Sequence, residues 1–148
     1  MWEKKNETKI LTYLGDSASS SYCSVNKKSK YFKKKKFFLT LNKLEKHKTQ
    51  ILTLASFLKK NKIKKIDYLK TDTEGYELNV IKGLKEHIKN VKVIQFEHHY
   101  NDMLVKDYTF HDIHSYLLRK GFHKIFKIKM PFRKSFEYGY ENIRYKNF

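Results

Sequence analysis

The sequence IDYLKTDTEGYELNVIKG, residues 66–83, predicts a buried strand, a tight acidic turn and the start of a helix. Its apolar run stops at Thr71, where polar residues take over, and such a break marks the end of a strand. Thr71 and Glu74 have the spacing of a capping box, so we expect a helix over about residues 73–82. Gly83 then fits the left-handed residue that closes a helix.

A second apolar run, residues 91–96, ends in Glu97, His98 and His99. Strand, helix and strand then span roughly the thirty residues of a βαβ unit, whose two strands pair in parallel. Open sheets of this kind bind their ligands outside the carboxyl ends of the strands. Asp72 and Glu97 each stand where an apolar strand stops, so we expect both to face one crevice, about 4.8 Å apart.

A resemblance to a known family rests on the segment KIDYLKTDTEGYELNVIKGL. It resembles the signature of the FkbM family of S-adenosylmethionine-dependent methyltransferases, in which an apolar strand ends in K-x-D-x-E-G-x-E and a helix closes on K-G. The matching residues are Lys70, Asp72, Glu74, Gly75, Glu77, Val80, Lys82 and Gly83. The resemblance covers residues 50–100 well and the flanks loosely. It implies an α/β fold, a partial Rossmann-like methyltransferase with a mostly parallel sheet and a C-terminal antiparallel pair.

The same resemblance implies a chemistry, the methylation of a hydroxyl on a sugar or a polyketide-like metabolite, with S-adenosylmethionine as the methyl donor. Such an enzyme must align the oxygen with the methyl carbon and remove its proton. We predict Asp72, Glu97 and His98 as catalytic residues, and Glu74 and His99 as substrate-binding residues. Which of them is the base stays open, because a carboxylate of ordinary pKa is a weak base and a neutral histidine is a better one. Helix capping and turn formation are the structural alternative for Asp72 and Glu74.

One departure from the family pattern concerns the cofactor. The family opens with a strand and a Gly-rich turn that holds the methionine part of S-adenosylmethionine, whereas the five glycines of this chain, at positions 15, 75, 83, 121 and 139, stand far apart. We therefore leave the cofactor-binding residues unassigned and expect residues 1–148 to be an incomplete FkbM-type domain. A longer protein or a partner chain would supply the rest. An inactive remnant that only pairs with a partner subunit is a further hypothesis.

The charge of the chain is strongly basic, with 33 Lys and Arg against 15 Asp and Glu, a net charge of +18. Such a balance suggests a polyanion or an anionic membrane as partner. Residues 26–36 combine lysines with Tyr31 and Phe32, and this is the most nucleic-acid-like stretch. However, only three of the 33 are arginines, and the abundant Lys, Ile, Asn, Tyr and Phe share A/T-rich codons. We expect residues 26–36 to be an extended lysine loop, and keep a nucleic-acid-associated protein as the alternative.

Cysteine and histidine usage bears on compartment and metals. A single cysteine, Cys23, excludes an internal disulfide framework and a multi-cysteine zinc site, so a cytoplasmic setting is the default. No stretch approaches the roughly 20 apolar residues of a membrane span. The histidines match no zinc motif, and the adjacent His98 and His99 of a strand point to opposite faces. We therefore assign no metal, and a divalent ion between Asp72 and Glu97 is the alternative that stays open.

The remaining elements follow from periodicity and capping residues. The expected elements are strands at residues 9–14, 122–130 and 141–148, a short helix at residues 55–60 with Thr53 as N-cap, and an amphipathic helix at residues 108–120 closed by Gly121.

Overall fold

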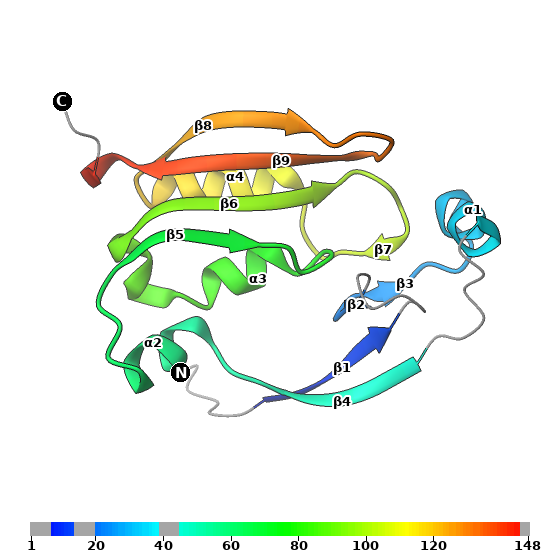
Figure 1. Cartoon of the computed structure of the whole chain (residues 1–148), viewed down its shortest axis with the longest axis horizontal. Coiled ribbons are helices and arrows are strands. Elements are labelled where there is room, and N and C mark those ends of the chain that lie inside the picture. The colour runs from blue at the N-terminus through cyan, green and yellow to red at the C-terminus, as the bar shows by residue number, and fades with distance from the viewer. Residues whose placement is uncertain (1–6, 14–19, 39–44, 146–148) are drawn as a thin grey trace.

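The computed structural model describes residues 7–13, 20–38 and 45–145. Its main sheet has four strands in the order β5-β6-β9-β8 (Figure 1). Along the chain these strands are β5 (Ile66–Thr71), β6 (Val91–His99), β8 (Phe122–Lys129) and β9 (Ser135–Asn142). β5 and β6 are parallel, whereas β9 runs antiparallel to both of its neighbours. The expected strand before the acidic turn and the expected parallel pair are therefore present.

The expectation of a mostly parallel Rossmann-like sheet is wrong. The described residues are mostly β, and they form one mixed sheet and two antiparallel ones. The reason is that β9 inserts between β6 and β8, and the pattern within a strand does not say which neighbour it takes. The C-terminal antiparallel pair is present as β8 and β9. Its second strand lies upstream of the expected residues 141–148, since a 3₁₀ helix, η2 (Ile143–Tyr145), follows it and residues 146–148 lie outside the described part.

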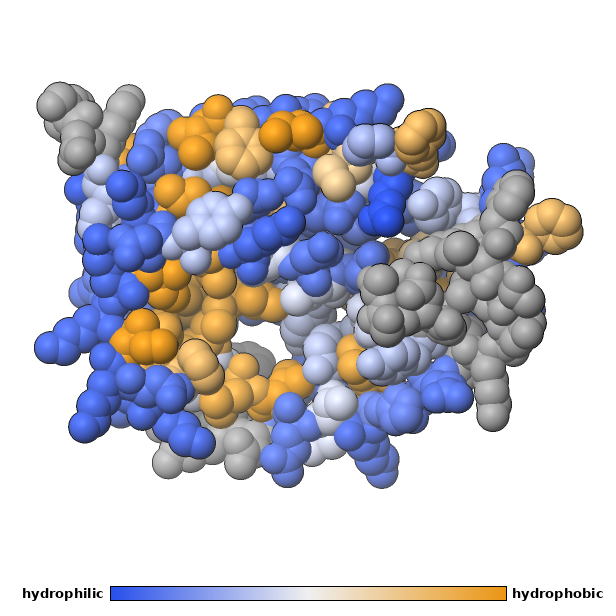
Figure 2. Space-filling view, viewed as in Figure 1, coloured by the Kyte–Doolittle hydropathy of each residue, from blue (hydrophilic) through white to orange (hydrophobic). Residues whose placement is uncertain are grey.

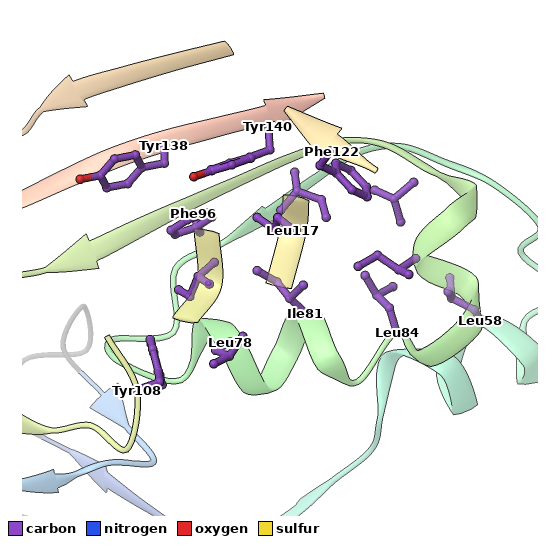
Figure 3. Packing of buried hydrophobic residues seen from close by; sticks show 14 residues of the cluster. Leu58, Leu78, Ile81, Leu84, Phe96, Tyr108, Leu117, Phe122, Tyr138 and Tyr140 are labelled. Carbon is purple, nitrogen blue, oxygen red and sulfur yellow. The ribbon is translucent and has the colours of Figure 1, made fainter. Parts of the chain in front are cut away.

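The hydrophobic core lies between the main sheet and the helical elements α3 (Glu77–Lys82), η1 (Lys85–Asn90) and α4 (Phe110–Arg119). Leu78, Ile81 and Leu84 point from the helical side toward the strands (Figure 3). Phe96 of β6 stacks on Tyr138 and Tyr140 of β9, with ring centroids 5.6 and 5.7 Å apart. This core fixes the face that β5 and β6 turn inward.

Helix α4 agrees with its sequence pattern. Thr109 and Asp112 form a complete capping box, and Ile113 and Leu117 are fully buried. Gly121 follows the helix with a φ of +83°, a value that glycine adopts without strain. The amphipathic helix and its glycine stop are therefore confirmed.

The turn between β5 and α3 differs from its expected form. The helix begins at Glu77 rather than near residue 73, and no side chain caps it, so the capping box predicted from Thr71 and Glu74 is wrong. Glu74 and Gly75 instead have φ values of +48° and +97°, which reverse the chain. Gly83 has a φ of −63°, so the left-handed stop predicted there is also wrong. A side chain at Gly83 would lie 3.0 Å from the carbonyl of Val80, which is why glycine fits.

The N-terminal part forms a separate antiparallel sheet in the order β2-β1-β4. Its strands are β1 (Glu7–Tyr13), β2 (Ser20–Ser21) and β4 (Glu45–Ile51), and a further strand, β3 (Ser24–Val25), pairs with β7 (Leu104–Val105). The strand expected at residues 9–14 is present as β1, although Leu14 lies outside the described residues. Thr53 caps helix α2 (Leu54–Lys60) through a bond from Ser56 N, as predicted.

The expected lysine loop is wrong, because residues 30–38 form helix α1 (Lys30–Phe38). The Ser29 hydroxyl accepts a hydrogen bond from Phe32 N and so caps the first turn. Phe32 is 6% exposed and packs with Met103 and Leu104. These contacts offset the repulsion between the lysines. Among the helices that the structure describes, none is long and apolar enough to cross a bilayer.

Candidate active site

The site is built on the carboxyl ends of β5 and β6. The parallel register pairs Thr71 with Phe96, so Asp72 and Glu97 follow at the same level of the sheet. Asp72 is exposed at its surface, while Glu97 is 3% exposed. Partial desolvation, and then the negative charges of Glu97 and Glu77, raise the pKa of Asp72 above its ordinary value. The two carboxylates therefore share one acidic environment, as the sequence led us to expect.

His99 lies between two carboxylates of this group. Its Nε2 is 3.3 Å from Glu74 Oε2 and 3.7 Å from Glu97 Oε1. Both His99 Nε2 and Glu97 Oε1 are buried, and neither makes an aligned hydrogen bond within the described residues. Lys106 donates to the carbonyl oxygen of His99, and burial lowers the pKa of this lysine. An imidazole held among buried carboxylates can carry or pass on a proton.

His98 faces the other side of the sheet. Its ring lies 4.9 Å from Tyr100, 6.0 Å from Tyr108 and 5.9 Å from Phe110, measured between centroids. Burial first, and then the charges of Lys106 and His99, lower the pKa of His98 to about 3. The structure thus brings together Asp72, Glu74, Glu97 and His99 and leaves His98 in an aromatic part of the core. The catalytic role of His98 stays a prediction from the sequence.

Glu77 organises the turn that carries Asp72 and Glu74. Its side chain is 1% exposed, and its Oε1 accepts from Thr73 N at 3.1 Å, Thr73 Oγ1 at 3.3 Å and Gly75 N at 3.0 Å. Its Oε2 accepts from the Tyr108 hydroxyl, whose pKa is raised by burial and by the charge of Glu77. In the sequence, Glu77 stood out only as one of the residues that match the family signature. The sequence feature that could have indicated this role is that Glu77 is the last acidic residue of the family signature.

The N-terminal segment backs the same turn. Ser21 Oγ donates to the carbonyl of Glu74 at 2.6 Å, and Cys23 Sγ donates to the carbonyl of Gly75 at 3.1 Å. Burial raises the pKa of the Cys23 thiol, so it stays protonated and able to donate. Nothing local in the sequence around Ser21 pointed to this contact, because its partner lies 53 residues away.

Neither a cofactor site nor a metal site is evident in the part of the chain that the structure describes. Four of the five glycines are described, and Gly75, Gly83 and Gly139 are packed against neighbouring atoms rather than gathered in one loop. A cavity of about 280 Å³ lies elsewhere, lined by residues of α3 and α4 and their flanks: Leu78, Lys82, His111, Asp112, Ser115, Tyr116 and Arg119. The described residues therefore do not fit S-adenosylmethionine by themselves. They also contain no group of three or more His, Cys, Asp or Glu that could hold a metal ion.

A buried acidic group outside the carboxyl ends of parallel strands is the usual place of an active site in α/β enzymes. Residues 4–124 of the chain match the family model described as the methyltransferase FkbM domain. The chain therefore belongs to the FkbM methyltransferase family. The match extends upstream of residue 50, where the sequence resemblance is weak. Searches of curated proteins and of solved structures found no match.

Proposed function

We propose that this chain takes part in the S-adenosylmethionine-dependent methylation of a hydroxyl group, on a sugar or a similar metabolite, and that it supplies the acceptor side of the site. Family membership supports a methyltransferase. The observation that carries the proposal further is the placement of His99 Nε2 between Glu74 and Glu97, beside Asp72. This group suits the binding and deprotonation of a hydroxyl.

Asp72 is the base in this proposal, because it is the member of the group that a substrate can reach from solvent. Its raised pKa makes it a stronger base than an ordinary carboxylate. Repulsion from Glu97 and Glu77 favours the uptake of a proton by Asp72, since protonation removes one of three nearby negative charges. His99 acts as a positioning residue that holds Glu74 and Glu97 in place behind it.

S-adenosylmethionine, when bound, supplies the electrophilic methyl group. Since the described residues do not fit it, we propose that its binding strands come from a longer form of the protein or from a partner chain. β5 offers the place for such an addition. Within the part of the chain that the structure describes, β5 pairs with a strand on one side only, and an unpaired strand edge readily accepts another strand.

The test compares source cells that carry the wild-type chain, no chain, or the Asp72→Asn variant, all fed with methyl-deuterated methionine. Mass spectrometry then reports which O-methyl groups are new. We expect a labelled methyl ether in wild-type cells that is absent without the chain. Asp72→Asn lowers its rate of formation by about 10²–10⁴, the usual contribution of a general base. The matched control is Asp67→Asn, an exposed aspartate of the same strand that pairs with Lys65. It leaves the labelling unchanged.

Three results would overturn this proposal. A label that appears on nitrogen rather than oxygen would exclude a hydroxyl acceptor. Equal labelling with and without the chain would favour the inactive remnant. Equal labelling by Asp72→Asn and wild type would remove Asp72 from the role of base.

We also propose a cytoplasmic location. Cys23 is the one cysteine of the chain, and its thiol is free. Reducing compartments keep thiols in that state.

A further inference from the structure

We propose that one end of the molecule binds the surface of an anionic lipid bilayer. Two protrusions carry this inference. They are helix α1 and the turn between β8 and β9, residues 130–134, and each combines an exposed phenylalanine with exposed basic side chains. The inference goes beyond the proposed methylation and stands without it.

Helix α1 has one anchored face and one face in water. Phe32 is buried, whereas Phe37 is 83% exposed. The exposed lysines around it are Lys27, Lys28, Lys30, Lys33, Lys34 and Lys36. Residues 20–38 contain no acidic residue. This surface is therefore basic throughout, with an aromatic side chain at its far end.

The β8–β9 turn repeats this combination independently. Phe132 is fully exposed, and Lys129, Arg133 and Lys134 beside it are exposed too. Phe132 also has a φ of +58°, a conformation that is costly for a bulky residue and that asparagine or glycine adopts more readily. Stability of the fold therefore gives no reason for phenylalanine at this position.

The segment that follows β6 ties both protrusions to the same end of the molecule. Tyr100 N donates to the carbonyl of Lys134 at 2.7 Å. Ser29, which caps α1, donates to Asp102 Oδ1 at 2.6 Å, and Asn26 N donates to the carbonyl of Met103 at 2.8 Å. Figure 1 shows α1 and the β8–β9 turn on the side of the molecule toward which the arrowheads of β5 and β6 point. At this end hydrophobic side chains stand out among hydrophilic ones (Figure 2).

This arrangement fits a bilayer better than a nucleic acid. Lysines are attracted to anionic headgroups, each by about fivefold in affinity, and aromatic side chains insert at the headgroup level. Two convex tips that carry aromatic side chains can reach a planar surface together. A single-stranded nucleic acid instead needs a continuous groove in which successive bases stack. The carboxyl ends of β5 and β6 point toward this side, so the candidate active site would then face the lipid surface.

The first experiment measures sedimentation of the full chain with vesicles of phosphatidylcholine, with and without phosphatidylserine. We expect binding only to the vesicles with phosphatidylserine, and weaker binding as salt rises. The triple variant Lys33→Glu, Lys34→Glu, Lys36→Glu lowers this affinity by about a hundredfold or more. The matched control carries the same charge change at the opposite end, Lys59→Glu, Lys60→Glu, Lys64→Glu, and stays within about fivefold of wild type.

The second experiment reports insertion directly. Phe37→Trp and Phe132→Trp are made singly in a Trp2→Phe chain, and brominated phosphatidylcholine is included in the anionic vesicles. We expect bromine to quench both tryptophans and to leave Phe57→Trp, a half-exposed position on α2, bright. Circular dichroism of each variant confirms that it folds.

Several outcomes would overturn the proposal. These are equal binding to both kinds of vesicle or to neither, equal losses in the two triple variants, or tryptophans at 37 and 132 that bromine does not quench. Tighter binding to a single-stranded oligonucleotide than to the anionic vesicles would establish the nucleic-acid alternative instead.

Discussion

The two larger sheets of the molecule differ in what stabilises them. The main sheet covers a core in which Ile81, Ile94 and Leu117 are fully buried. In the N-terminal sheet, β4 buries no side chain and β1 buries only Thr12. The seven paired positions of β1 and β4 are therefore joined mainly through their backbones. In the main sheet, the side chains of the buried face specify which residues pair across the strands. The N-terminal sheet has almost no buried face, so its strand pairing is specified mainly by backbone hydrogen bonds.

The largest expected effect on the free energy of unfolding comes from truncating one isoleucine in each region: Ile81, which packs against the main sheet, and Ile10 of the N-terminal sheet. Ile81→Ala leaves a cavity in the core and should lower the free energy of unfolding by about 4 kcal/mol. Ile10→Ala, at a position of β1 that is 51% exposed, should lower it by about 0.5 kcal/mol or less. Urea unfolding measures both. Similar losses in the two variants would mean that the N-terminal sheet is buried against something.

The next effect is an acid destabilisation that arises in the main sheet. The folded-state pKa of His98 is about 3, below its ordinary value of 6.5. As the pH falls, His98 is therefore protonated in the unfolded chain at a higher pH than in the folded chain. Stability is therefore lost as the pH falls from about 6.5 toward 3, by roughly 2–3 kcal/mol at about pH 4.5. The raised pKa of Asp72 acts in the opposite sense and offsets part of the loss, because the folded state holds that proton more tightly.

Urea unfolding at several pH values checks this origin. His98→Phe should flatten the loss between about pH 6.5 and pH 4.5, since no proton is then taken up there. His47→Phe, on exposed β4, should leave the loss unchanged. An unaltered pH profile in His98→Phe would contradict the account.

A smaller effect tests the turn that carries the site. Glu77→Gln places an amide among donors that need an acceptor, and should cost about 2 kcal/mol of the free energy of unfolding. Tyr108→Phe removes one of these donors and should cost about 1 kcal/mol. Glu45→Gln, an exposed change in β4, should cost nothing measurable in the same urea unfolding. If Glu77→Gln changed the free energy of unfolding as little as Glu45→Gln, the hydrogen bonds to Glu77 would not be what stabilises the turn.

Elements that a single residue pattern defines were predictable from the sequence. The apolar run before Thr71, the N-cap Thr53 and the capped helix α4 were all predictable. Elements whose position or conformation depends on contacts distant in the sequence were not predictable. β9 takes its place between β6 and β8 through long-range pairing, and α1 forms because Phe32 packs on Met103 and Leu104.

The candidate site was predictable to the same extent. The neighbourhood of Asp72 and Glu97 followed from the βαβ pattern, since parallel strands end at the same edge. The alternation of a strand puts Glu97 and His99 on one face and His98 on the other. The pattern therefore favoured His99 over His98 as a neighbour of the carboxylates, although we predicted both as site residues. The hydrogen bonds from Ser21 and Cys23 to the turn join residues that are distant in the sequence, so no local pattern predicted them.

The most direct test of the central claim is a disulfide between the two strand ends. In a Cys23→Ser chain, which then has no other cysteine, the pair Asp72→Cys and Glu97→Cys should cross-link on mild oxidation, because neighbouring strands lie about 4.8 Å apart and a disulfide spans that distance. The control pair, Asp67→Cys and Glu97→Cys, should stay reduced. Mass spectrometry of the intact chain would show the loss of two hydrogens in the first pair alone. A first pair that stays reduced under the same mild oxidation, or that cross-links no more than the control pair, would contradict the account of the site.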